Sequence, residues 1–587
     1  MRPVAPAGLR RRVRICFAAF AIILATLGLD LFFIQVIRHP ALAREQKEIQ
    51  TVTANLLGAR GTIFDRNGVP LAFSRISFSV FADPGRLDPK QQPAVQLASV
   101  LNEPQPKIVA ALAKPGRFAW LLRRADDATV AQARELCKPI RGADGKWAPR
   151  VSGVGFKPEK KRLYPYGELA GQTIGMVRDD DTGGAGIEAA CDRLLSGRDG
   201  YVVAEVDGSR RRRVIPGRRL QQVEPRPGRD VYLTIDVRIQ EIAEAALRDG
   251  VQSCGAAGGT AVVVDPMTGD VLALANYPSA DPNRYREYKR EAWRNPAVVC
   301  VYEPGSTFKL VAACAALEYG GKTPESPVTT CIGSKPIGRR VIHCALHGGS
   351  RAHGAVDLHG VIVKSCNIGA ATLALGVGRD KFYRTLRDFG FTRRTGIGLP
   401  AEAAGFVPPR RTWADIQLAN LGFGQGITVT APQLLAAYAG IAAGGIVPHV
   451  HLVDHIGRHG HKLAYRGHRA ISQRIAQTML SLLRDVVTEG TGKAAQVEGF
   501  TVAGKTGTAQ KPVPGQGYDS GKYIGSFVGF APAEDPRVAI LVIMDEPKSS
   551  HYGGVVAAPV FADIARRSLA YMGMPPRLLA AAADLTR

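Results

Sequence analysis

Three short strings in this sequence contain the residue types that nucleophilic acyl transfer needs. They are Ser306-Thr307-Phe308-Lys309, Ser365-Cys366-Asn367 and Lys505-Thr506-Gly507-Thr508, in that order along the chain. A serine hydroxyl is a weak nucleophile at neutral pH unless a base lies within hydrogen-bond reach. Residues three apart on a helix share a face, so we expect the Lys309 amine beside the Ser306 hydroxyl.

A lysine acts as a base only when its pKa falls from the usual value of about 10.4. Burial and a second nearby cation both lower that pKa, and Lys505 is the candidate for the second cation. Ser365 is placed to relay a proton to a leaving amine. Asn367 is expected to hold Lys309 and the amide of a substrate.

The residues around Ser306 predict that it opens a helix. Pro304-Gly305 precedes it and an apolar run follows Lys309, so the serine N–H is left free to stabilise an oxyanion. The string around Gly507 follows a short apolar strand. The hydroxyls of Thr506 and Thr508 can bind a carboxylate there, and the Thr508 N–H can supply a second oxyanion donor.

The order of the three strings and the residues around them make the set more specific than any one string alone. By composition, Ser-x-x-Lys is expected about once or twice by chance in a chain this long, and Lys-Thr-Gly roughly a tenth of a time. The alternative interpretation, a capping serine with surface lysines and a turn glycine, must explain all three strings together. The set therefore favours a serine acyl-transfer site.

The elements that must position these strings follow a break at Pro225–Gly228. Apolar residues at helix spacing predict a helix after Asp236, its expected N-cap. The region from 306 to about 487 is predicted mainly helical. Strands on both sides of helices predict one antiparallel sheet covered by helices. The predicted strands are 260–264, 270–275, 523–531 and 538–544, and a last helix is predicted over 556–572.

The N-terminal region predicts a membrane anchor. Residues 15–37 are apolar apart from Thr26, Asp30 and Gln35, and 23 residues at 1.5 Å each span about 34 Å. Arginines in residues 2–14 predict a cytoplasmic N-terminus. A cleaved signal peptide ending near Ala41-Leu42-Ala43 is the alternative, but its apolar core would be much shorter. Asp30 either faces a partner helix or tilts toward the interface.

The net charge of +25 favours an anionic neighbour or a solvated basic surface. The sequence contains no zinc-finger spacing, RNA-binding aromatic signature or basic-region heptad, which argues against nucleic acid. The nine cysteines include Cys331 and Cys344 around a possible hairpin. With His343 and His347 nearby, a metal site is conceivable, but the spacing matches no standard zinc pattern and favours a disulfide. Cys366 is expected to be a small packed residue.

The strings closely resemble those of class B penicillin-binding proteins, the monofunctional D,D-transpeptidases of peptidoglycan. The resemblance covers nearly the whole chain. It includes five further stretches outside the three strings. These are Arg60–Gly68, Arg162–Pro165, Gly186–Glu188, Gly422–Gly426 and Thr430–Leu434.

The resemblance implies an α+β multidomain protein. It would have a transmembrane helix, an elongated mixed pedestal (dimerisation-type) domain and a C-terminal penicillin-binding transpeptidase domain with an antiparallel sheet flanked by helices. A separate transglycosylase domain is not expected. The implied segments are a cytoplasmic tail 1–14, the helix 15–37, the pedestal 38–228, the transpeptidase domain 229–575 and a tail 576–587.

The resemblance also implies that Ser306 forms an acyl-enzyme with the penultimate D-Ala of a stem peptide and expels the terminal D-Ala. An amine of a neighbouring stem peptide would then take the acyl group, and β-lactams would trap Ser306. No cofactor and no metal are implied. The implied catalytic residues are Ser306, Lys309, Ser365, Asn367 and Lys505, and the implied substrate-binding residues are Thr506, Gly507 and Thr508.

The family has division and elongation branches, and the context of Ser306 resembles the division branch, although the Cys331/Cys344 pair is atypical there. A membrane glycosyltransferase of the shape and division family is the implied protein partner. The implied location is the inner (plasma) membrane with the catalytic domain outside the cytoplasm. The alternatives are a D,D-carboxypeptidase or β-lactam hydrolase, or a non-catalytic β-lactam sensor or scaffold.

Overall fold

The computed structural model divides into two compact units, one formed by Met1–Ala59 with Gly197–Pro227 and the other by Arg60–Ser196 with Gly228–Arg587. Of the predicted tails 1–14 and 576–587, residues 1–6 and 577–587 lie outside the described residues. The described residues are 7–88, 92–141, 147–207, 214–344, 352–511, 518 and 521–576.

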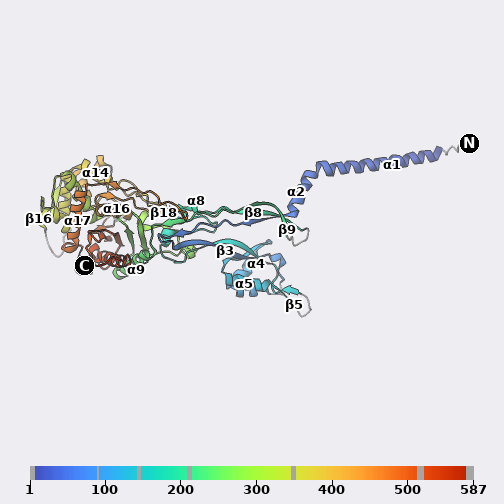
Figure 1. Cartoon of the computed structure of the whole chain (residues 1–587), viewed down its shortest axis with the longest axis horizontal. Coiled ribbons are helices and arrows are strands. Elements are labelled where there is room, and N and C mark those ends of the chain that lie inside the picture. Colours follow the sequence, from blue (N-terminus) through green and yellow to red (C-terminus); the bar gives the residue numbers. More distant parts are fainter. Residues whose placement is uncertain are drawn as a thin grey trace, which may run out of the picture. The chain divides into compact units, whose positions relative to one another are not determined.

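The first unit begins with a long apolar helix, drawn in blue in Figure 1. Helix α1 (Ala7–Phe32) continues as a π-helical turn (Phe33–Ile37), and Gly8–Ile37 is long and apolar enough to cross a membrane. Its large apolar side chains are exposed, as in a helix surrounded by lipid. The helix predicted over 15–37 is therefore present, and it suits a single-pass anchor.

The rest of the first unit is a short helix and a small sheet. Helix α2 (His39–Gln50) leads into β1 (Thr51–Leu56). The antiparallel sheet has the order β1-β8-β9, with β8 at Gly200–Val206 and β9 at Val214–Val223.

The second unit begins with a mixed sheet in the order β18-β10-β2-β3-β4, and β7 pairs with β3. The turn predicted at Asn67-Gly68 joins β2 to β3, and Gly68 has φ +82°, which only glycine adopts easily. Three helices pack against this sheet in one apolar cluster. They are α3 (Pro93–Leu101), α4 (Gln105–Leu112) and α5 (Asp127–Cys137). The strands are β2 Ile63–Phe64, β3 Pro70–Ala82, β4 Ala119–Ala125, β7 Val154–Leu163, β10 Val231–Leu233 and β18 Val453–Ile456.

A buried ion network joins the three family-like stretches of this region. Glu188 accepts from Arg60 Nε at 2.7 Å and from Arg162 Nε at 2.6 Å. The Arg60 and Glu188 side chains are fully buried. Arg60 also donates to the Asp192 carboxylate at 2.7 Å. The network thus holds together three stretches of the second unit that are far apart in the sequence.

We expect Glu188→Ala to destabilise this region strongly, because it leaves two buried guanidinium groups without their shared carboxylate. Breaking such a pair from one side costs about 3–5 kcal/mol. The measurement is the thermal unfolding midpoint of the purified protein. Glu287→Ala is the matched control, because its exposed partner Arg284 stays hydrated, and it should leave the midpoint unchanged. Equal midpoints for both variants would contradict the network's role.

The C-terminal part of the second unit is built on a five-stranded sheet. Its order is β12-β11-β22-β21-β20, and every neighbouring pair is antiparallel. The predicted antiparallel sheet is confirmed. In Figure 1 its strands come from the green and the orange-to-red parts of the chain, which are far apart in sequence. The strands are β11 Gly258–Val264, β12 Val271–Tyr277, β20 Ala503–Gln510, β21 Tyr523–Ala531 and β22 Val538–Asp545.

Each face of this sheet packs on helices. Helix α9 (Val237–Cys254), which Asp236 caps as predicted, and α19 (Ala558–Tyr571) pack on one face. Helix α16 (Ala431–Ala442) packs on the other face. Along β11, Val263 faces the first set of helices while Val262 and Val264 face the second, as strand alternation requires.

Further helices pack around α11 (Lys309–Tyr319), on the side of the sheet opposite to α9 and α19. The main ones are α12 Leu358–Val363, α13 Asn367–Val377, α14 Arg379–Asp388, α15 Asp415–Gly422 and α17 Gln473–Thr488. The short strands here are β13 Pro327–Cys331, β14 Ser334–Ile337, β15 Arg340–His343, β16 Gly354–Asp357, β17 Ile446–Val447 and β19 His468–Arg469. Other short elements are β5 Pro139–Arg141, β6 Trp147–Pro149, α6 Gly171–Ile174, α7 Gly186–Ala190, α8 Asp192–Leu195, α10 Pro296–Val299 and α18 Gly553–Val556.

Candidate active site

Ser306 lies in a tight turn that leads into α11. The turn is a 3-10 segment, Gly305–Phe308, and α11 follows without a break. Gly305 has φ +53° and donates to the carbonyl of Gly424 at 3.1 Å. A Cβ on Gly424 would lie 2.3 Å from the Gly305 carbonyl oxygen. A glycine from the family-like stretch 422–426 therefore allows the backbone to approach the serine turn closely.

Lys309 contacts Ser306 as the helical spacing predicts. Its Nζ lies 2.7 Å from Ser306 Oγ, 2.7 Å from the Ser365 carbonyl oxygen and 3.0 Å from Ser365 Oγ. The side chain is fully buried. The amine is therefore fixed against the serine hydroxyl and has no access to bulk water.

Ser365 connects the two lysines. Its Oγ lies 3.0 Å from Lys309 Nζ and 3.1 Å from Lys505 Nζ. Its φ of +59° is in the left-handed region, which non-glycine residues adopt at an energetic cost. The surrounding structure must hold this conformation, and the hydroxyl is thereby placed between the two amines.

Burial lowers the pKa of both lysines, and the Lys309 charge lowers that of Lys505 further. Burial lowers the pKa of Lys309 to about 8. Burial and the nearby Lys309 charge hold the pKa of Lys505 well below its usual value. The described hydrogen-bond partners of the two amines are oxygens of Ser306, Ser365 and Thr506, none of them a carboxylate. The pocket thus favours a neutral amine beside Ser306.

The third string forms the edge of the sheet beside the serine turn. A Cβ on Gly507 would lie 2.4 Å from Ser526 Oγ and 2.9 Å from Thr307 Cγ2, so a side chain there would push the strand and the turn apart. Thr506 Oγ1 lies 2.8 Å from Thr491 Oγ1. Thr508 Oγ1 accepts from the Gly553 N–H at 3.3 Å. These contacts orient the two threonine hydroxyls.

A groove of about 860 Å³ connects these groups. Ser306, Ser365, Asn367, Thr506 and Thr508 all line it, so the structure brings most of the predicted site residues to one cavity. Lys309 and Lys505 lie beneath it, in contact with Ser365. The sequence analysis did not identify several other lining residues, because no motif marks them. They are Thr491, Lys493, Tyr523, His551 and Tyr552.

Asn367 has different partners from those predicted. Its side-chain amide donates to the His343 carbonyl at 3.3 Å, and its backbone N–H donates to Cys344 Sγ at 3.3 Å. The described hydrogen bonds of Lys309 go to Ser306 and Ser365 instead. Asn367, the first residue of α13, still lines the groove, where it can meet a substrate amide.

The predicted disulfide is wrong. Cys331 and Cys344 are both free thiols in this structure, and the hairpin between them is formed by the pairing of β14 with β15.

Two family descriptions cover most of the chain. Residues 259–566 match the family described as penicillin binding protein transpeptidase domain. Residues 55–233 match the family described as penicillin-binding protein dimerisation domain. The first match contains all three chemical strings, and the second contains the Arg60–Glu188 network.

Individual proteins match the chain along almost its full length. The probable peptidoglycan D,D-transpeptidase PbpC of Pseudomonas aeruginosa is 33% identical over 97% of this chain and 96% of its own. The peptidoglycan D,D-transpeptidase FtsI of Escherichia coli K12 is 32% identical over 93% of this chain and 89% of its own. The crystal structure of penicillin binding protein 3 of Mycobacterium tuberculosis with ampicillin is 30% identical, with a TM-score of 0.67 over 89% of this chain and 97% of that chain.

Proposed function

Because this chain belongs to the class B penicillin-binding proteins, the penicillin-binding D,D-transpeptidases of peptidoglycan, we propose that Ser306 is its acyl-transfer nucleophile. The neutral Lys309 amine takes the hydroxyl proton as Ser306 Oγ attacks the carbonyl of the penultimate D-Ala of a stem peptide. The proton passes through Ser365 to the amine of the departing D-Ala. An acyl-enzyme ester remains on Ser306.

The second half of the reaction returns the enzyme to its starting state. The amine of a neighbouring stem peptide attacks the ester carbonyl, its proton goes back through Ser365 and Lys309, and Ser306 Oγ leaves as a hydroxyl. A new peptide bond between the two stem peptides is the product. β-Lactams react at the first step and leave Ser306 blocked.

One observation carries this proposal. The Lys309 amine is buried, has no carboxylate partner in the part of the chain that the structure describes, and lies 2.7 Å from Ser306 Oγ. A buried amine with a pKa lowered to about 8 is partly neutral near neutral pH, and this neutral form is a competent general base for a hydroxyl in direct contact. A surface lysine with an ordinary pKa would be protonated and inactive in this role.

We assign the substrate carboxylate to the β20 edge. Thr506 and Thr508 offer hydroxyls on the groove side, and Lys505 adds a donor that also touches Thr506 Oγ1 at 3.3 Å. Gly507 allows the strand to lie against the serine turn. Asn367 is assigned to the substrate's amide from its position on the groove wall.

The wider organisation follows the same assignment. We propose a cytoplasmic tail 1–14, a membrane anchor 15–37, a pedestal domain 38–228, a transpeptidase domain 229–575 and a tail 576–587. The excess of arginine before the apolar helix favours a cytoplasmic N-terminus, which puts the catalytic domain outside the cytoplasm. A membrane glycosyltransferase of the shape and division family is the proposed partner. Similarity to FtsI supports a role in septal wall synthesis.

A labelled-penicillin assay combined with a peptide assay tests the proposed activity. The protein should form a long-lived adduct with labelled penicillin. With a D-Ala-D-Ala stem peptide and an acceptor amine, it should release D-Ala and yield the cross-linked dimer. Rapid turnover of the penicillin, or D-Ala release with no dimer, would assign the site to hydrolysis. Localisation of a tagged protein to mid-cell rather than the side wall tests the septal role.

The rate of acylation is expected to rise with pH. With a Lys309 pKa of about 8, the neutral base makes up about a tenth of the protein at pH 7 and about nine tenths at pH 9. Because only the neutral amine accepts the Ser306 proton, the second-order rate constant with penicillin should increase about tenfold between these values. Stopped-flow measurement at constant ionic strength checks the profile. A flat or falling profile would contradict the assignment of Lys309 as the base.

A further inference from the structure

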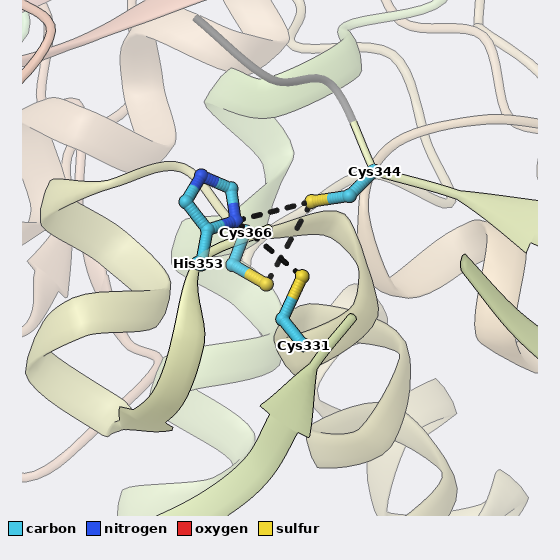
Figure 2. A group of neighbouring side chains, drawn as sticks. All are labelled: Cys331, Cys344, His353 and Cys366. Atoms are coloured by element: carbon cyan, nitrogen blue, oxygen red, sulfur yellow. Dashed lines mark hydrogen bonds between the residues drawn. The ribbon is translucent and has the colours of Figure 1, made fainter. Parts of the chain in front are cut away.

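Four potential metal ligands converge next to the second string. The side chains of Cys331, Cys344, His353 and Cys366 point toward a common centre (Figure 2), and their ligand atoms all lie within 4.8 Å of one another. Cys331 ends β13, Cys344 follows β15, His353 precedes β16 and Cys366 caps α13. The fold therefore assembles this cluster from four separate elements.

Three of the six separations between the ligand atoms are close to those of a tetrahedral zinc site, and the other three are at most 4.8 Å. Zinc bonds of about 2.3 Å to sulfur and about 2.0–2.1 Å to nitrogen give about 3.8 Å between two sulfurs and about 3.6 Å between sulfur and nitrogen. Cys344 Sγ lies 3.8 Å from Cys366 Sγ. His353 Nδ1 lies 3.6 Å from Cys331 Sγ and 3.4 Å from Cys344 Sγ.

A disulfide accounts for these atoms less well. A bridge needs its two sulfurs about 2.05 Å apart, and it would use only two of the three thiols. The third cysteine and the imidazole would then have no reason to share the same centre. The predicted Cys331–Cys344 pair is thus part of a larger set. Its histidine is His353. The His343 carbonyl instead accepts from Asn367, and His347 lies outside the described residues.

Backbone amides support the sulfurs in the way expected of metal thiolates. The Asn367 N–H donates to Cys344 Sγ at 3.3 Å, and the Gly369 N–H donates to Cys366 Sγ at 3.3 Å. Such contacts from outside the ligand set orient thiolates and stabilise their negative charge. Cys331 and Cys366 are fully buried, so solvent has little access to the centre.

We propose that these four residues bind one Zn²⁺ ion as a Cys₃His site. Three thiolates and one imidazole are soft and borderline donors in a tetrahedral arrangement, which selects Zn²⁺ over Mg²⁺ or Ca²⁺. All four coordination positions come from the protein, so the ion has a structural role and no open position for a substrate or water.

Because this centre adjoins the second string, a bound metal would also affect acylation, and this role rests on the proposed function. Cys366 lies between Ser365 and Asn367, and the Asn367 N–H contacts Cys344 Sγ. Ser365 has φ +59°, a strained conformation that needs external support. The metal fixes Cys366 and thereby holds the Ser365 hydroxyl between the two lysines. The four ligands are therefore positioning residues for the acylation site.

Metal analysis of the full-length protein tests the site independently of activity. We expect about one Zn²⁺ per chain in protein purified without chelator, and none in Cys331→Ser. Cys254→Ser is the matched control, because this buried cysteine lies in the other core cluster and its thiol donates to the Val251 carbonyl within α9. Replacement of the zinc with Co²⁺ should give thiolate-to-cobalt charge-transfer absorption. Wild-type protein that holds no stoichiometric zinc, or a disulfide within the cluster found by mass spectrometry, overturns the proposal.

A ligand exchange separates metal binding from general damage to the fold. Cys331→His retains four ligands, so it should retain Zn²⁺ and acylate with labelled penicillin within about threefold of wild type. Metal-free wild type should acylate at least tenfold more slowly, and added Zn²⁺ should restore the rate. If the zinc is present but its removal leaves acylation unchanged, the site stands and its positioning role is overturned. If zinc-loaded protein forms no adduct at all, the proposed function fails and the metal site stands.

Discussion

Ser306→Ala is expected to abolish covalent labelling by penicillin completely. The ester forms on Ser306 Oγ, and the variant has no atom that can take its place. Ser365 lines the same groove, but its Oγ is held between two amines, and its carbonyl is also committed to Lys309. D-Ala release from a stem peptide and dimer formation should be lost together with the label.

Labelled penicillin followed by denaturing gel electrophoresis measures this effect directly. Ser253→Ala is a suitable control, because the Ser253 hydroxyl is exposed, donates to the Gly250 carbonyl within α9 and belongs to none of the three strings. This variant should label like wild type. The groove of Ser306→Ala remains intact, so non-covalent binding of penicillin should persist in a calorimetric or fluorescence titration. A covalent adduct that survives in Ser306→Ala would show that another residue is the nucleophile.

Lys309→Met is expected to reduce the acylation rate constant by about 10³-fold, the usual contribution of a positioned general base. Methionine has nearly the length of lysine and tolerates the buried position, so the groove should keep its shape. The loss arises because Ser306 Oγ no longer has an amine 2.7 Å away to take its proton. The variant also removes the donor to the Ser365 carbonyl, so the position of the second string is weakened too.

The pH profile distinguishes the loss of a base from the loss of packing. The slow residual acylation of Lys309→Met should no longer follow the rise between pH 7 and 9 that the wild type shows. Lys381→Met in α14 serves as the control, since the ammonium group of that lysine is exposed and donates to the Tyr319 carbonyl, away from the three strings. A decrease of less than tenfold, or a profile that still rises as in wild type, would exclude Lys309 as the base and move the role to Lys505.

The sequence predicted the local chemistry well because that chemistry depends on short spacings. Ser306 and Lys309 are separated by one helical turn, so their contact follows from helix geometry alone. The strands after residue 258, the Asp236 cap and the turn at Gly68 are likewise set by local patterns. The apolar helix was evident because a membrane span needs a long uninterrupted run of apolar residues.

The environment of the lysines could not be read from the sequence. The lowered pKa values of Lys309 and Lys505 depend on burial, and that of Lys505 also on the nearby Lys309 charge; only the packed core provides both. The same is true of Asn367, whose partners turned out to be His343 and Cys344. Groove residues such as Thr491 and His551 belong to no motif, and only the fold brings them to the site.

The cysteines show most clearly the difference between what sequence spacing predicts and what the fold assembles. The sequence alone favoured a pairing of Cys331 with Cys344, because two cysteines that flank a hairpin are close by local geometry. His353 and Cys366 join them only because β13, β15, β16 and α13 meet in the folded domain. Sequence spacing thus determined which groups are reactive and which local contacts form, since these depend on bonds and single turns. The tertiary structure decided their charge states and the members of each cluster, because both depend on burial and on contacts between distant segments.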